Sequence, residues 1–128
     1  MDDIFVGQLM SAPVETVRPH TTLDEAAAQL LEHNISSVVV IDADGYLEGI
    51  LTATDFVRLA SESKVASEET VGDYMSSGVV TAAANDPITE VADTMIDNRF
   101  HHVPVVDETE GVVGIITTTD LTAYVSGR

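Results

Sequence analysis

The sequence has 128 residues, of which 45% are hydrophobic, 22 are Asp or Glu and only five are Lys or Arg, so its formal net charge is −17. This length fits one domain or two very small halves that share a core, and the apolar fraction is enough to bury a core, so a folded chain is expected rather than a disordered one. The charge argues against direct DNA or RNA binding, which requires basic residues to displace counterions, and the absence of cysteine excludes disulfides, thiolate metal sites and cysteine nucleophiles.

The first regular segment is predicted at residues 14–17, a short extended piece that ends before Arg18-Pro19. The next motif, Thr22-Leu23-Asp24-Glu25, is a capping box in which Thr22 and Glu25 can satisfy each other's backbone donors. The helix that it opens has one apolar stripe at helical spacing. The members of this stripe are Leu23, Ala26, Ala27, Leu30 and Leu31.

Two strands and a second helix are predicted next. The apolar, β-branched runs at residues 37–41 and 47–51 form the strands, and Asp42-Ala43-Asp44-Gly45 has the chemistry of the turn between them. Either Thr52 or Thr54 then caps the second helix. The first half of the chain therefore has the order βαββα.

The second half of the chain follows the same order after a polar linker at residues 63–69. Residues 70–73 begin a short helical turn, and Asp86-Pro87 is predicted as an N-cap followed by a proline at the first helical position. Residues 102–106 and 112–116 are the two strands of this half. The apolar stripe of its first helix comprises Ile88, Val91, Ala92, Met95 and Ile96.

The two halves match without gaps at an offset of 65 residues, which aligns Gly49 with Gly114 and Asp55 with Asp120. Chance does not keep one register over about fifty residues, so the chain is a duplication, with repeats at 1–62 and 70–128. One repeat buries too little surface to be stable alone. We therefore predict a mixed α/β fold of two repeats related by a pseudo-twofold axis. Their sheets would pack face to face and leave a cleft on each side of the axis.

These motifs resemble a tandem pair of cystathionine β-synthase (CBS) domains, a Bateman module. The resemblance extends from about Val6 to Val125 and is carried by the order, spacing and duplication of the motifs together. It implies a stand-alone regulatory module that needs no cofactor and binds an adenosine nucleotide (AMP, ADP or ATP), with S-adenosylmethionine or NAD as alternatives. The motifs are Val14-Glu15-Thr16-Val17-Arg18-Pro19, the capped helix, His101-His102-Val103-Pro104-Val105-Val106-Asp107 and the two Gly-h-h-Thr-x-Thr-Asp segments.

The resemblance also implies two ligand sites, each built from the end of one repeat and the early segments of the other. Site A would consist of Thr52, Thr54, Asp55, Val80, Thr81, Phe100 and His101. Site B would consist of Thr117, Thr119, Asp120, Glu15, Thr16, Ile35 and Ser36.

The chemistry of these positions suits a nucleotide. Asp55 and Asp120 fall in the first turn of a helix, where a carboxylate can accept two hydrogen bonds from a ribose diol, although each could equally cap its helix. The neighbouring threonine hydroxyls and free backbone N–H groups suit phosphate oxygens, with simple capping as the alternative. His101 is a further expected phosphate contact, and Arg99 a weaker one, while neither metal binding nor catalysis is supported by any spacing of side chains.

The two sites differ in composition. Site A has Phe100 and His101 where site B has Ile35 and Ser36, and Glu15 would repel a phosphate in site B if it faced inward. We therefore expect site A to bind the phosphorylated nucleotide better, while site B takes a nucleoside-like ligand or stays empty.

The expected partners are a second copy of the chain and an unidentified downstream protein. The residues predicted for the homodimer contact, if they are exposed, are Phe56, Leu59, Leu121, Tyr124 and Val125. Two other functions stay open: a dimerising scaffold that binds no ligand, and a small carboxylate-based hydrolase, for which no nucleophile–base–orienter set is visible.

Localisation and source follow from composition. No apolar run approaches the roughly 18 residues of a transmembrane helix, and Met1-Asp2-Asp3 is acidic where a signal peptide would be basic. We expect a cytoplasmic protein without membrane contact. Carboxylate repulsion opposes the compact state in dilute buffer and is screened at molar salt, so we expect a halophilic archaeon as the source, an ordinary acidic protein being the alternative.

Overall fold

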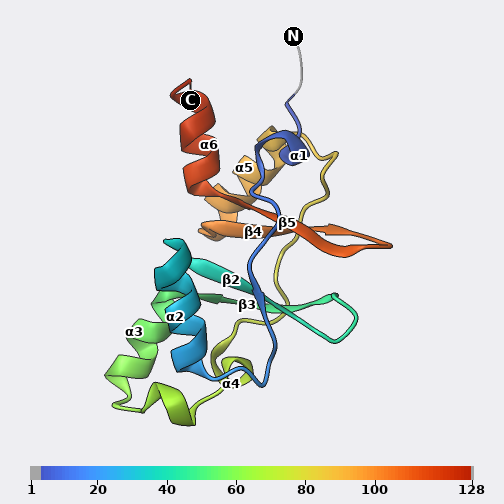
Figure 1. Cartoon of the computed structure of the whole chain (residues 1–128). Coiled ribbons are helices and arrows are strands. Elements are labelled where there is room, and N and C mark those ends of the chain that lie inside the picture. Colours follow the sequence, from blue (N-terminus) through green and yellow to red (C-terminus); the bar gives the residue numbers. More distant parts are fainter. Residues whose placement is uncertain (1–3, 128) are drawn as a thin grey trace. The chain divides into compact units, whose positions relative to one another are not determined.

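The computed structural model describes residues 4–127, which form a mixed α/β fold with two small sheets (Figure 1). Met1-Asp2-Asp3, on which the prediction about a signal peptide depends, lies outside the described residues. The chain divides into two compact units. One unit is Glu15–Val79, and the other combines the segment up to Val14 with the segment from Val80 onward.

The unit Glu15–Val79 contains a three-stranded sheet in the order β1-β2-β3. β1 pairs in parallel with β2, and β2 pairs antiparallel with β3, so the predicted strands and the turn between them are confirmed. The elements of this unit are β1 (Thr16–Val17), α2 (Leu23–His33), β2 (Ser37–Ile41), β3 (Leu47–Thr52), α3 (Ala53–Ser61), the 3₁₀ helix η1 (Ala66–Glu68) and α4 (Val71–Tyr74).

The second unit repeats this pattern with a two-stranded antiparallel sheet. A parallel bridge between Ala82 and Val105 takes the place of β1 and has the register of the Val17–Val40 pair in the first repeat. The elements of this unit are α1 (Val6–Leu9), α5 (Ile88–Asn98), β4 (His102–Asp107), β5 (Gly111–Thr117) and α6 (Thr118–Val125).

The short helix that opens each repeat packs in the unit that holds the other repeat's sheet. After α4, the backbone of Ser76 exchanges two hydrogen bonds with Ile50 of β3, at 2.9 and 3.0 Å. After α1, the backbone of Ser11 makes the same exchange with Ile115 of β5, at 2.8 and 3.1 Å. The compact units therefore do not coincide with the repeats seen in the sequence.

Each unit has its own apolar core, formed by one face of its sheet and the helices packed on that face. Leu23, Ala26 and Leu30 of α2 are buried with the sheet residues Val38, Val40 and Leu51. Val91 and Met95 of α5 are buried with Val103, Val105 and Ile116. The repeats thus bury equivalent positions.

Each predicted apolar stripe includes one residue that is largely exposed. Leu31 is 83% exposed and its counterpart Ile96 is 74% exposed, so neither belongs to the core. Only the positions that face the narrow sheet are covered, because a sheet of two or three strands is not wide enough to cover a second row of a helix. Leu59, predicted as a dimer contact if exposed, is 7% exposed and cannot provide one, whereas Tyr124 and Val125 are exposed.

Two predicted helix starts differ in detail. Thr22 is the N-cap of α2, but its side chain makes no cap hydrogen bond; the N–H of Leu23 instead donates to the carbonyl of Glu69 at 3.0 Å. Pro87, rather than Asp86, is the N-cap of α5. The Asp86 carboxylate instead closes a turn by accepting from the N–H of Ala83 at 2.9 Å.

Tyr74 joins α4 to the end of α3. Its hydroxyl donates to Glu62 Oε1 at 2.6 Å, and this hydrogen bond, with burial, raises the pKa of Tyr74 to about 12. We expect Tyr74→Phe to lower the free energy of unfolding at neutral pH, because Glu62 loses its partner. The phenol's contribution is fully present below its unfolded pKa of 10.0 and is lost as the pH rises through about 12. The urea midpoints of the wild type and of Tyr74→Phe should be compared at about pH 8 and about pH 11. We expect the gap between the two proteins to be smaller at pH 11, and a gap of the same size at both pH values would contradict this.

Candidate functional site

In the unit Glu15–Val79, one end of the sheet gathers residues predicted for both sites. Ser37 at the start of β2 pairs with Thr52 at the end of β3. The N–H of Ala53, the first residue of α3, donates to the carbonyl of Ser36 at 2.9 Å. Thr16 of β1 lies beside Val39, two residues further along β2. Ser36 and Thr16 of site B therefore lie near Thr52 of site A.

The second unit has the same arrangement at its own sheet end. His102 pairs with Thr117, and the N–H of Thr118 donates to the carbonyl of His101 at 3.0 Å. Thr81 precedes the bridge residue Ala82. Each unit thus holds one part of both predicted sites, and the joining of the parts into site A and site B stays a prediction.

Asp55 is fixed at the start of α3 by the residue that caps this helix. Its Oδ2 accepts the N–H of Thr52 at 2.8 Å, so Thr52, rather than Thr54, is the N-cap. The side chain of Asp55 is 15% exposed, and its Oδ1 lies 4.0 Å from Nη2 of Arg58. Capping therefore occupies one carboxylate oxygen and leaves the other beside a guanidinium group.

Asp120 has the equivalent position at the start of α6. Its Oδ2 accepts the N–H of Thr117 at 2.9 Å, and its own N–H donates to Thr117 Oγ1 at 3.2 Å. The second oxygen, Oδ1, lies 3.5 Å from the hydroxyl of Ser11. Both carboxylates therefore use one oxygen to cap their helices, which is the alternative role that the sequence analysis gave them. The second oxygen of each carboxylate is still able to contact a ligand.

Apolar side chains at the predicted site positions are partly uncovered. Ile35 is 37% exposed, and its counterpart in the other repeat, Phe100, is 39% exposed. Val80 is also 37% exposed. An adenine ring presents two apolar faces, so exposed apolar groups beside the hydroxyls and carboxylate of each sheet end match a nucleoside chemically.

The two adjacent histidines differ in burial. His101 is exposed, while His102, the first residue of β4, is half-buried. Burial of the imidazole and, to a lesser degree, the proximity of His101 lower the pKa of His102. His102 is therefore held in its neutral form, which leaves the accessible His101 as the better candidate for contact with an anion.

Glu15 is held on the α2 side of β1. Its Oε1 accepts from Gln29 Nε2 at 3.2 Å and lies 3.1 Å from Nε2 of His33. Val17, two residues along, is buried in the core with α2, so alternation places Thr16 on the opposite side of the strand. Glu15 does not share the direction of Thr16, and the predicted repulsion of a phosphate by an inward-facing Glu15 is not supported.

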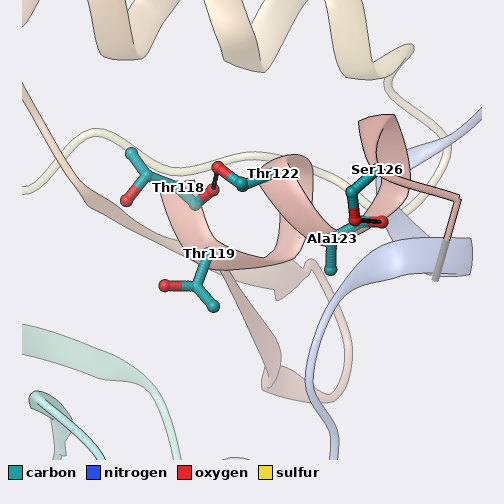
Figure 2. Close-up of a pocket in the computed structure, with 5 residues that line it drawn as sticks. All are labelled: Thr118, Thr119, Thr122, Ala123 and Ser126. Atoms are coloured by element: carbon teal, nitrogen blue, oxygen red, sulfur yellow. Dashed lines mark hydrogen bonds between the residues drawn. The ribbon is translucent and has the colours of Figure 1, made fainter.

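A shallow recess of about 260 Å³ lies along α6 (Figure 2). Thr122 Oγ1 donates to the carbonyl of Thr118 at 2.8 Å, and Ser126 Oγ donates to that of Ala123 at 2.9 Å. These two hydroxyls therefore present only acceptor atoms to the recess. Thr119 is the one lining residue that the sequence predicted for a site. The lining is Thr118, Thr119, Thr122, Ala123 and Ser126.

Arg58 is an arginine beside a predicted site carboxylate that the sequence analysis did not single out, while the phosphate contact expected of Arg99 stays a prediction. Arg99, the predicted weak phosphate contact, is the left-handed C-cap of α5 with φ 58°. Arg58 is the arginine beside Asp55. The i, i+3 spacing of Asp55 and Arg58 on one predicted helix was the available signal.

Neither a metal cluster nor a membrane span was found in the described part of the chain. Between residues 4 and 127, no group of three His, Asp or Glu side chains is placed to hold a metal ion. No helix within this range has both the length and the apolar character needed to cross a bilayer.

Comparison with known proteins gives consistent matches. The CBS domain family matches twice, at residues 6–62 and 71–127. An uncharacterized 17.7 kDa protein of Acidianus ambivalens is 34% identical over 116 residues, which are 91% of this chain and 70% of that protein. The L-aspartate semialdehyde sulfurtransferase of Methanocaldococcus jannaschii is 32% identical over 97% of this chain, which spans only 24% of that enzyme.

One solved structure is similar to the chain in both fold and sequence. The CBS domain pair of protein MJ0100, crystallised with 5′-methylthioadenosine and S-adenosyl-L-methionine, superposes with a TM-score of 0.91 at 32% identity. The match covers 98% of each chain. The mixed α/β fold predicted from the sequence is therefore confirmed.

Proposed function

Because this chain belongs to the CBS domain family and carries two such domains, we propose that it is a regulatory module that binds an adenosine-containing ligand and reports it to a partner protein. The observation that carries the proposal is the paired arrangement at α3 and α6. In both copies one oxygen of an aspartate caps the helix while the other is left for further contacts. Such a fixed carboxylate is suited to accept hydrogen bonds from the two hydroxyls of a ribose.

The ligand class is supported by the surroundings of each aspartate. Threonine hydroxyls and helix N–H groups suit phosphate or ribose oxygens, and Ile35 and Phe100 offer apolar surface for a base. The related CBS pair of protein MJ0100 was solved with two adenosine derivatives. AMP, ADP and ATP are the first candidates, with S-adenosylmethionine and NAD as alternatives.

Signalling requires that the ligand bind two conformations with different affinity. We propose that the module does no chemistry itself and acts through a homodimer and a downstream protein. A wholly apolar groove between α5 and α6, of about 140 Å³, supports an association through α6. Its lining includes the exposed Tyr124 and Val125.

Isothermal titration tests the proposal with AMP, ATP, S-adenosylmethionine, 5′-methylthioadenosine and NAD in about 1 M KCl. We expect at least one ligand to bind, and Asp55→Asn and Asp120→Asn each to remove or weaken one site by about tenfold, because asparagine can keep the cap acceptor but replaces the second carboxylate oxygen with a donor. Asp86→Asn is the matched control, because its carboxylate also accepts a nearby backbone N–H but lies outside the predicted sites.

Three results would redirect the proposal. A protein that binds none of the ligands would be a dimerising scaffold. Binding that is unchanged in both aspartate variants would place the ligand elsewhere. Equal losses of AMP affinity at the two sites would refute the predicted preference of site A for a phosphorylated nucleotide.

A further inference from the structure

Arg58 is held in one orientation by its neighbours in the unit Glu15–Val79. Its Nη2 donates to the carbonyl of Tyr74 at 2.9 Å, and its guanidinium carbon lies 4.8 Å from the centre of the Tyr74 ring. Tyr74 is itself fixed by its hydrogen bond to Glu62. An arginine that is already held in one orientation loses less side-chain entropy when a ligand binds to it.

The same guanidinium remains accessible beside the proposed ribose-binding carboxylate. The side chain of Arg58 is 51% exposed, and Nη2 lies 4.0 Å from Oδ1 of Asp55, the oxygen that is not used in capping. A guanidinium has five N–H donors, and the Tyr74 carbonyl uses one of them. The remaining donors can form paired hydrogen bonds with phosphate oxygens.

The strongly negative net charge of the chain makes a cation beside Asp55 necessary for binding a phosphate. With 22 acidic and five basic residues, the chain repels a phosphate wherever no cation lies nearby. A phosphorylated ligand that places its ribose on Asp55 adds its own negative charge near that carboxylate. Binding of a phosphorylated ligand at Asp55 therefore needs a local cation, and Arg58 is the cation that the structure places beside it.

The other repeat has no equivalent of Arg58. The position 65 residues later is Ala123, which lies in the hydroxyl-lined recess along α6 (Figure 2). The second oxygen of Asp120 faces the neutral hydroxyl of Ser11 instead of a guanidinium. The two carboxylates are thus alike in their capping and differ in the charge beside them.

We propose that Arg58 is the residue that makes the Asp55 site select ligands with a phosphate, while the Asp120 site, with Ala123 in its place, takes adenosine derivatives without one. This inference rests on the proposed function. It replaces Glu15 with Arg58 as the physical cause of the difference between the sites.

The test compares AMP with adenosine, which differ only by the phosphate, in an Asp120→Asn background that isolates the Asp55 site. We expect Arg58→Gln to raise the Kd for AMP by about tenfold and to leave the Kd for adenosine within about twofold, since only the phosphate loses its partner. Arg58→Lys should weaken AMP less than Arg58→Gln does, because an ammonium keeps the positive charge but cannot form paired hydrogen bonds with a phosphate. Lys64→Gln, which removes one exposed positive charge from the segment after α3, should change neither Kd.

A second variant tests the inference without disturbing Tyr74. In an Asp55→Asn background, Ala123→Arg should tighten AMP several-fold at the Asp120 site and leave adenosine unchanged. Equal weakening of AMP and adenosine by Arg58→Gln would show a structural role only, and an unchanged AMP-to-adenosine ratio in both variants would overturn the inference. A wild-type protein that binds adenosine derivatives while failing these tests keeps the proposed function, whereas one that binds none loses both.

Discussion

Gly49→Ala is expected to lower the free energy of unfolding by about 2–3 kcal/mol, the range of an overpacked core position. A methyl group on Gly49 would lie 2.6 Å from the carbonyl oxygen of Ser76 and 2.8 Å from Sδ of Met75. That carbonyl accepts the N–H of Ile50 at 3.0 Å, so the backbone cannot move away without losing the hydrogen bond that joins the α4 segment to β3.

The counterpart Gly114→Ala should cost less. The nearest atom to its added methyl group is Sδ of Met10 at 2.6 Å, the flexible end of a side chain, while the carbonyl oxygen of Ser11 is 3.0 Å away. A methionine can rotate to another conformation more easily than a backbone can shift. We expect a loss of about 1 kcal/mol for this variant, at the lower end of the overpacking range.

Urea unfolding of both variants checks these expectations. Glu48→Ala, at the exposed residue next to Gly49 on β3, is the control and should change stability by less than about 0.5 kcal/mol. The order Gly49→Ala, Gly114→Ala, Glu48→Ala, from largest loss to smallest, is the prediction. A Gly49→Ala protein with the wild-type midpoint would show that the α4 segment does not pack against β3 in solution.

A large increase in thermal stability with salt is the second expected result. Within residues 4–127, the arginine–carboxylate pair found is Arg58–Asp55, and Glu15 contacts the imidazole of His33, so most carboxylates have no cationic partner to offset their mutual repulsion. The Debye length falls from about 10 Å at 0.1 M salt to about 3 Å at 1 M, which screens repulsion between neighbouring surface charges. We expect the Tm to rise by on the order of 10 °C between about 0.1 and 2 M KCl.

Differential scanning calorimetry over a KCl series measures this effect. A variant with Glu32→Gln, Glu68→Gln and Glu108→Gln, all exposed positions, is the matched control. It should have a higher Tm than wild type at low salt and a smaller rise with KCl, because fewer charges remain to be screened. A Tm that does not depend on KCl, or that rises equally in both proteins, would contradict the charge-repulsion account.

The local order of elements was predictable from the sequence because it is encoded in neighbouring residues. Apolar runs predicted all of β2, β3, β4 and β5 to within one or two residues at each end. The caps of α3 and α6 were predictable because Thr52 and Asp55, like Thr117 and Asp120, are only three residues apart. The duplication, and the core positions Leu23, Ala26 and Leu30 with their counterparts in the other repeat, followed from one repeated pattern.

The tertiary structure decided the features that depend on distant segments. Leu31 and Ile96 fit the helical stripe but are exposed, because coverage depends on the width of the sheet below. Thr22 fits a capping box, but its side chain makes no cap hydrogen bond, and Glu69, far along the chain, supplies a carbonyl to the first N–H of α2. Neither outcome has a signal within one turn of the residue concerned.

The sequence by itself determined two copies of a βαββα unit with an aspartate at each second helix start. Only the tertiary structure decided that the segment after each opening helix pairs with the other repeat's sheet and that Gly49 must lack a side chain there. It also decided that the Tyr74 carbonyl orients Arg58 and that Glu15 lies beside Gln29 and His33. Helix and strand periodicity reports which face of an element is apolar. It does not report which segment fills an open strand edge, because any backbone can supply those hydrogen bonds.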